Sequence, residues 1–509
     1  MFQSLRTRLA IGLTFGCLAV GLSGFSGRSA VAQLREPKKP RIPGSYQSLG
    51  DMMKANRDSA TKYLPSVPRI VVDDDKVARA GVRKIAGKRL TLYTDLPSEP
   101  WIDELPAVFD QAFPAYCAYF NIAPDKIPDW NLTGFLMNEK GLFVRLGLLP
   151  KKIPAFEHGF ACNYDFWLYK HKSEYYTRHL VLHEGVHCFM NTLLGSCGPP
   201  WYMEGIAELL STHHWKDGKL TANYIPTNRD EVPLWGRVRI IKDAIAAGKP
   251  MKLKDVIDYQ WGAHLKTEPY AWSWAAAVMM DRHPRYQGRF RQLYRIVLAP
   301  DFNQRFHQAF AADWELMQQD WQLFINNIEY GHDIAATAVD YRPGKPLPAK
   351  PARFKISAVR GWQNTGLQLV AGEKYAIRSV GRYQVDNEPQ VWWCEPGGVS
   401  IRYYHGRPLG ILLAAVRPEV SRKNGLNPLL QPDPIGLATT FVPKQSGTLF
   451  MRINDSAAEL KDNAGELWVE VKRAPPPPPP PIPPEVPQET PPAEGQPGPN
   501  GTEGEPTED

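Results

Sequence analysis

Two histidines and a glutamate near the middle of the chain have the spacing of a metal site. His183 and His187 are four residues apart, so on a helix both side chains project from one face and can reach a single cation. Glu184 follows the first histidine, where its carboxylate can take a proton from a metal-bound water. The pattern predicts a zinc site with Glu184 as general base. The alternative is a pair of core histidines on an apolar helix.

A catalytic zinc keeps three protein ligands and one open position, so a third ligand has to come from another segment. Two carboxylates follow in a second helical stretch, with sixteen residues between His187 and Glu204 and twenty between His187 and Glu208. Either residue could supply the third ligand, and the other would then help to orient a histidine.

Two helices are predicted to position these side chains. Apolar residues recur at helical spacing over residues 174–194, where Ser173 can cap the start and Gly195 can end the helix. Pro199 and Pro200 prevent the helix from continuing, and Pro200 suits the first turn of the next one. We expect Arg178 and His179 to lie on the solvent side without a role.

The surrounding pattern predicts a mixed sheet and then a mainly helical lobe. Strands are expected at residues 89–93, 130–137 and 160–169, and helices at 101–120, 237–247, 271–280, 289–297 and 313–328.

Proline and basic residues at 336–353 indicate a linker. Beyond it, short alternating runs at 366–376, 411–416, 448–453 and 467–471 predict an all-β module over residues 354–473. Residues 474–509 are rich in proline, glycine and acids, which is typical of a disordered tail. The expected fold class is therefore α+β multidomain.

The N-terminus predicts export. Arg6 and Arg8 precede a short apolar run, and Ala30-Val31-Ala32 resembles a cleavage site, so residues 1–32 read as a signal peptide. An uncleaved anchor and lipidation at Cys17 are the alternatives. No later segment is apolar enough to predict a transmembrane span. Residues 33–85 are expected to be a linker or a loosely packed arm, and the mature protein to be periplasmic, cell-surface or secreted.

Composition fits a soluble multidomain protein. The 509 residues predict two or three units, and a formal charge of +7 spread along the chain argues against nucleic acid as a partner. Five cysteines follow the predicted signal. An oxidising compartment would allow a disulfide between Cys188 and Cys197.

The two motif helices resemble those of a known peptidase family. His183 to His187 followed by Glu204-Gly205-Ile206-Ala207 is similar to the gluzincin metallopeptidases, in their peptidase MA-like branch, over about residues 85–330. The resemblance implies a zinc metallopeptidase domain at 86–335 in which Glu204 is the third ligand and Glu208 a partner behind it. It also implies an oxyanion donor, for which Tyr270 is our candidate. The spacing from His187 is shorter than in relatives, and on count alone Glu208 fits better.

The β module resembles a family of bacterial lectins. Gly361-Trp362, Leu409-Gly410-Ile411-Leu412 and Ile453-Asn454-Asp455 are similar to segments of the calcium-dependent galactophilic lectins. The resemblance implies calcium ligands at Asp455, Asp462 and Asn463 and a carbohydrate partner. The sugar-contacting loop of that family is not recognisable at residues 403–408.

Together these patterns predict an exported zinc-dependent metallopeptidase with a peptide or protein substrate. One alternative is a non-catalytic surface or glycan-binding protein that retains a peptidase-like fold. Another is a zinc hydrolase that acts on a different acyl substrate.

Overall fold

The computed structural model describes residues 68–260, 262, 266–419 and 425–474. The predicted signal peptide, the arm up to residue 67 and the predicted tail from residue 475 lie outside these residues. Over the described part the chain is a mixed α+β protein with several sheets. None of the helices described there is long and apolar enough to cross a membrane.

A five-stranded mixed sheet organises the first part of the chain. Its strands stand in the order β1-β2-β3-β5-β4, with β2–β3 and β3–β5 parallel and both edge pairs antiparallel. The strands are β1 (Arg83–Ala86), β2 (Leu90–Thr94), β3 (Leu132–Met137), β4 (Gly159–Cys162) and β5 (Asp165–Tyr169). β4 is therefore an edge strand, with one side free of strand pairing.

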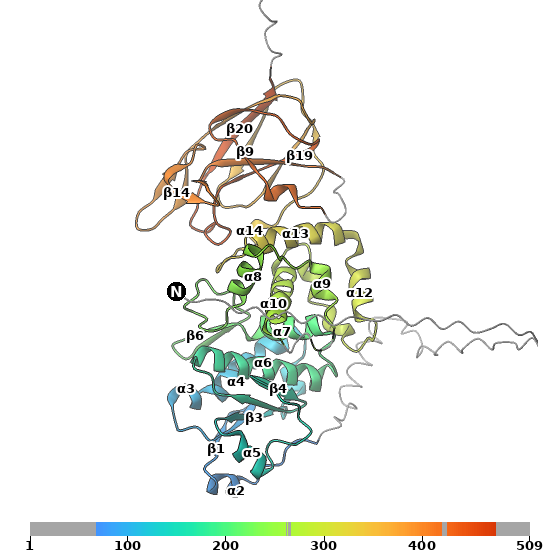
Figure 1. The fold of residues 1–509 in the computed structure, drawn as a ribbon, viewed down its shortest axis with the longest axis vertical. Coiled ribbons are helices and arrows are strands. Elements are labelled where there is room, and N and C mark those ends of the chain that lie inside the picture. Colours follow the sequence, from blue (N-terminus) through green and yellow to red (C-terminus); the bar gives the residue numbers. More distant parts are fainter. Residues whose placement is uncertain (1–67, 261, 263–265, 420–424, 475–509) are drawn as a thin grey trace, which may run out of the picture. The chain divides into compact units, whose positions relative to one another are not determined.

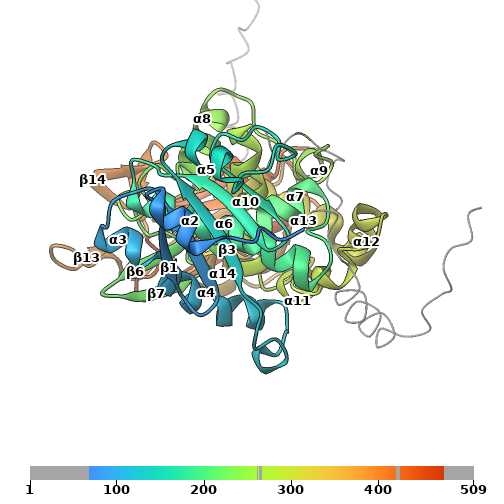
Figure 2. The same ribbon diagram turned by 90° about the horizontal axis from the view of Figure 1, so that it is seen from below.

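Side chains alternate between the two faces of the sheet along each strand, and both faces carry apolar residues. Helices therefore cover both faces. Leu92 and Leu132 join the large core under α4 (Leu105–Tyr119) and α6 (Glu174–Leu193). Tyr93 and Phe135 face the opposite side, toward α2 (Asp74–Arg79) and α5 (Lys140–Leu146), which lie on that face in Figure 2.

Helix α6 lies between the sheet and the helical lobe (Figure 1). It packs on α7 (Pro200–Ser211), and α7 packs closely on α10 (Thr267–Arg282). Gly205 permits this approach, since a Cβ atom at that position would lie 2.8 Å from the carbonyl oxygen of Ser273. The glycine of the Glu-Gly-x-Ala motif thus sets how deeply α7, and with it Glu204, is buried.

Helix α3 (Pro100–Asp103) precedes α4 beside the sheet. The remaining elements of the helical lobe are the hairpin β6 (His213–Lys216) and β7 (Lys219–Ala222), α8 (Arg237–Ala246), α9 (Leu253–Ile257), α11 (Gln287–Phe290), α12 (Phe302–Ala309), α13 (Trp314–Asn326) and α14 (Ile334–Thr337).

Two sheets enclose a second core in the C-terminal part, ordered β17-β16-β19-β10-β8 and β18-β11-β20-β9. Two small hairpins, β12–β13 and β14–β15, project from them. The strands are β8 (Lys345–Pro346), β9 (Ala352–Ser357), β10 (Gln363–Leu369), β11 (Tyr375–Val380), β12 (Tyr383–Asp386), β13 (Trp392–Cys394), β14 (Val399–Tyr404), β15 (Arg407–Leu409), β16 (Leu412–Arg417), β17 (Asp433–Pro434), β18 (Ala438–Phe441), β19 (Gly447–Ile453) and β20 (Glu466–Arg473).

The segment expected to be a linker at 336–353 carries packed structure. Tyr341 is buried, its hydroxyl donates to Asp320 Oδ1 at 2.9 Å, and its ring packs against Phe450 of β19. Asp320 also accepts hydrogen bonds from Tyr286 and Arg285. Proline content alone did not reveal this, because proline restricts the backbone without preventing neighbouring side chains from being buried.

Three further expectations differ from the structure. Residues 160–169 form a hairpin, β4–β5, turning at Asn163 with a φ of 58°, rather than one strand. The helix expected at 289–297 is broken into α11 and a 3₁₀ turn, Leu293–Ile296. Part of the expected arm is ordered, because Val77 and Val82 are buried and β1 pairs with β2.

Candidate metal centre and cleft

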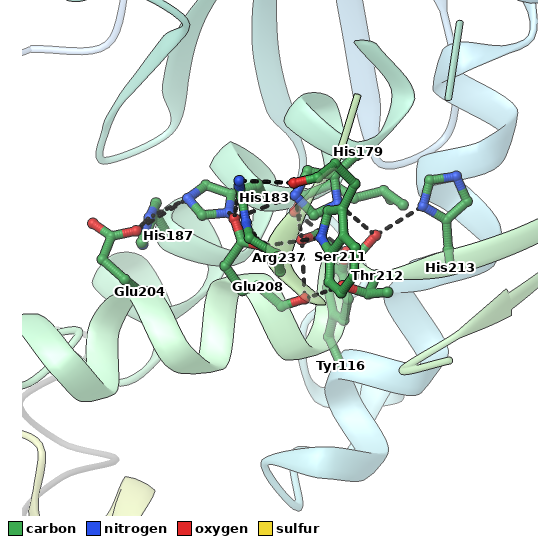
Figure 3. Close-up of polar contacts among 12 residues, drawn as sticks. Tyr116, His179, His183, His187, Glu204, Glu208, Ser211, Thr212, His213 and Arg237 are labelled. Atoms are coloured by element: carbon green, nitrogen blue, oxygen red, sulfur yellow. Dashed lines mark hydrogen bonds and ion pairs between the residues drawn. The ribbon is translucent and has the colours of Figure 1, made fainter. Parts of the chain in front are cut away.

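Helix α6 brings the two motif histidines together as their spacing predicts. The helix begins at Glu174, where the Ser173 hydroxyl accepts the N–H of Tyr176, and it runs without a break through both residues. The Nε2 atoms of His183 and His187 lie 3.1 Å apart, and both side chains are buried (Figure 3).

Glu204 completes a three-residue cluster from the neighbouring helix α7. Its Oε2 atom lies 3.2 Å from Nε2 of His183 and 3.4 Å from Nε2 of His187. This oxygen is buried and accepts no well-formed hydrogen bond. Three convergent donor atoms, one of them an orphaned carboxylate oxygen, fit the ligand set of zinc.

The charges in this cluster call for a cation. Burial lowers the pKa of His183, but the carboxylates of Glu204 and Glu208 outweigh it and raise the pKa to about 10. Burial raises the pKa of Glu204, and the two imidazoles outweigh it and bring the pKa to about 2. The Glu204 carboxylate therefore stays ionised and stabilises a positive charge beside it, which protons or a metal ion can supply.

Glu208 lies behind this cluster, on the far side of His183. Its Oε1 is 3.4 Å from Nδ1 of His183, and it also contacts His179. The Arg237 guanidinium donates to both oxygens, at 2.8 and 3.0 Å. Burial opposes ionisation of Glu208, but Arg237 and His179 hold its pKa well below the usual range. Glu208 is thus committed to Arg237, while Glu204 faces the two Nε2 atoms.

Glu184 is buried beside the cluster and against the edge strand. A Cβ atom on Gly159 of β4 would lie only 2.4 Å from Oε1 of Glu184, so a larger residue there would force the Glu184 side chain to move. Burial raises the pKa of Glu184, although His183 and His187 oppose the shift. A carboxylate with a raised pKa accepts a proton more readily, as a general base must.

A cleft of about 590 Å³ opens over these residues. Its wall includes β4 and the segment before it, and Tyr270 from the first turn of α10 lies on the other side. The Tyr270 ring lies 5.8 Å from the ring of His183, with the Arg237 guanidinium 5.6 Å from its centre. Burial, with the nearby Glu204 and Glu184, raises the pKa of Tyr270, so its hydroxyl stays a hydrogen-bond donor.

In the C-terminal loop expected to bind calcium, the structure brings Asp455 and Asn463 into contact, and Asp462 adjoins Asn463 in the sequence. Asp455 is buried and accepts from Asn463 Nδ2 at 2.8 Å. Burial raises the pKa of Asp455 to about 6. Oδ1 of Asp462 and Oδ1 of Asn463 are both buried without a hydrogen-bond partner. Unpartnered oxygens in one loop are suited to a hard cation.

Comparisons with known proteins give little beyond this geometry. No protein-family model matches the chain, and no curated protein matches it. Among solved structures the chain is similar to one described as "EclA N-terminal domain; PllA-like lectin". The identity is 27%, the match covers 24% of this chain and 95% of that one, and the TM-score is 0.19.

Sequence reasoning missed two residues of the site. His179, expected on the solvent side, is fully buried, and its Nε2 contacts Glu208 at 3.4 Å. Its position four residues before His183 placed it on the same face of the helix, a signal that was present. Arg237 gave no such signal, because α8 begins more than twenty residues after α7 ends. Arg178 is likewise buried and pairs with Glu104 at 2.9 Å.

The disulfide that an oxidising compartment would allow is not formed among the described cysteines. Cys188 and Cys197 are buried free thiols with different acceptors, the carbonyl of Asp165 for the first and the side chain of Asn191 for the second. Burial raises the pKa of both thiols, which makes them unreactive.

Proposed function

We propose that the protein is a zinc-dependent peptidase whose metal ligands are His183, His187 and Glu204. The observation that carries the proposal is the convergence of two Nε2 atoms, 3.1 Å apart, on the orphaned Oε2 of Glu204. Zinc bound there would lower the pKa of a bound water and polarise a carbonyl. The similarity of the motif helices to gluzincins, noted above, points the same way.

In this proposal the chain's own residues divide the work. Glu184 takes the proton from the attacking water and later passes it to the leaving amine. Tyr270 donates a hydrogen bond to the oxygen of the scissile carbonyl as charge develops on it. Glu208, held by Arg237, orients His183 through its Nδ1 side.

An extended peptide is the substrate that the cleft suits best. Strand β4 lines the cleft and pairs with β5 on one side only. Its other edge offers backbone N–H and C=O groups to which a peptide can add as a further strand. Phe156 and Phe160 supply an apolar wall nearby, suited to substrate side chains. This edge favours peptides over other acyl compounds as the substrate.

The decisive experiment compares Glu184→Gln with Glu174→Gln in a peptide-library digest by purified full-length protein. Glu184→Gln should keep its zinc and lose several orders of magnitude in turnover, because the proton acceptor is gone. Glu174 lies exposed in the first turn of the same helix, so its variant should cleave normally. Cleavage by Glu184→Gln at the wild-type rate, or no cleavage by wild-type protein loaded with zinc, would favour the non-catalytic alternative.

A second proposal concerns the C-terminal sandwich, which we infer binds calcium through Asp455, Asp462 and Asn463. The two orphaned oxygens of Asp462 and Asn463 support it. A carbohydrate partner for this module and export of the mature chain are further proposals, the latter resting on residues 1–32.

A further inference from the structure

A second pair of imidazoles stands at the rim of the same cleft. Nδ1 of His158 and Nε2 of His171 lie 3.0 Å apart and share a hydrogen bond, at almost the separation of the two Nε2 atoms of His183 and His187, which is 3.1 Å. His158 is among the residues that line the cleft, and both histidines are half-buried. The pair takes no part in the proposed peptide chemistry.

Backbone contacts hold both histidines in place. The His158 carbonyl accepts the N–H of Tyr169, which extends the β4–β5 ladder by one bond. The His171 N–H donates to the Thr177 hydroxyl in the first turns of α6, at 3.0 Å. The Tyr176 ring packs edge-on against His171, with centroids 4.7 Å apart. A ligand that binds both rings therefore has little conformational entropy to overcome.

We propose that His158 and His171 form a second transition-metal site, separate from the cluster on α6 and α7. Metal–nitrogen bonds of about 2.0–2.1 Å would span the two nitrogens with roughly a right angle at the metal. Two imidazoles select zinc or copper rather than calcium or magnesium, which require oxygen ligands. The remaining positions are left for water or for an acidic group of a substrate, and with two protein ligands this site binds a metal far more weakly than the three-ligand cluster on α6 and α7.

The surroundings of the pair suit this assignment. The carboxylate of Glu157, next in sequence to His158, acts electrostatically on His171, so a negative charge stands close to the pair. This negative charge would stabilise a bound cation.

Zinc counting on the full-length protein tests the site. After dialysis against buffered free zinc, wild-type protein should hold two equivalents of different affinity. His158→Ala and His171→Ala should each lose only the weaker equivalent, while His183→Ala loses the tighter one. His405→Ala, which removes an exposed histidine from the β14–β15 turn, should keep both. Wild-type stoichiometry in His158→Ala and His171→Ala would overturn the proposal.

Copper gives an independent measurement that does not depend on peptidase activity. Protein preloaded with one equivalent of zinc and then given Cu²⁺ should show an electron paramagnetic resonance signal with two nitrogen ligands. His158→Gln keeps a polar side chain and should fold, yet it should lose that signal. A two-nitrogen signal that persists in His158→Gln would show that copper binds elsewhere and would refute the assignment.

Discussion

The α6–α7 cluster and the Asp455 loop both gather buried oxygens without partners, but they are built differently. In the first, His183, His187 and Glu204 stand on two long helices that pack together. In the second, Asp455, Asp462 and Asn463 lie between strands β19 and β20, in a segment without regular structure apart from turns. Helical spacing brings two ligands together locally, whereas a loop depends on the strands around it to set every distance.

A motif on a helix predicts which side chains meet more reliably than a motif in a loop does. A spacing of four residues on a helix leaves little choice about which side chains meet. A succession of aspartates and asparagines between strands is also what ordinary turns contain, so the residues alone do not distinguish a metal loop from a turn.

The largest effect should come from the third ligand. Glu204→Ala leaves zinc with two protein ligands, so affinity for zinc should collapse. Glu208→Ala removes only the partner behind His183 and should lower affinity by about 10 to 100-fold. Titration against a competing chelator ranks the two variants. A larger loss of affinity in Glu208→Ala would assign the ligand to Glu208, as the residue count favours.

Arg237 should matter for folding more than its distance in sequence suggests. Arg237→Ala leaves the buried Glu208 carboxylate without its main partner, which typically costs about 3–5 kcal/mol in unfolding free energy. Arg239→Ala is the matched control, because Arg239 is exposed on the same helix and pairs only with Asp243. Denaturant unfolding measures both. Equal midpoints for the two variants would contradict the role given to Arg237.

A methyl group at Gly159 should impair catalysis without removing the metal. The added Cβ atom would displace the Glu184 carboxylate, which lies 2.4 Å from that position. A displacement of about 1 Å at a catalytic group typically costs about 100-fold in turnover. Zinc content should stay at the wild-type level. Gly288→Ala, in α11 with an ordinary backbone conformation and no heavy atom within 4 Å, controls for an added methyl group. Unchanged turnover in Gly159→Ala would show that the reaction does not depend on the position of Glu184.

Calcium should give the smallest effect. Millimolar calcium should raise the melting temperature of the C-terminal β-sandwich by a few degrees. A shift of this order is expected when a ligand binds only the folded state. Asp462→Asn removes a charge from the loop and should reduce that rise. Magnesium should raise the melting temperature less than calcium does. A melting temperature that does not respond to calcium would leave the Asp455 loop as an ordinary turn.

The helices of the site could be predicted because their signals are local. Ser173 at the start of α6, Pro200 at the start of α7 and the apolar spacing between them specify where each helix begins and how it is oriented about its axis. The β4–β5 hairpin could not be predicted, because Phe160 to Tyr169 is almost continuously apolar or aromatic and only the αL turn at Asn163 separates the strands.

The sequence by itself determined which residues can act as ligands and base, since a helical repeat places His183, Glu184 and His187 on known faces. Only the tertiary structure gave Glu204 and Glu208 different surroundings. Both glutamates project from the same face of α7, one turn apart, so helical spacing alone does not distinguish them. The choice follows from the packing of α8, which brings the Arg237 guanidinium onto Glu208 and leaves Glu204 facing the two imidazoles.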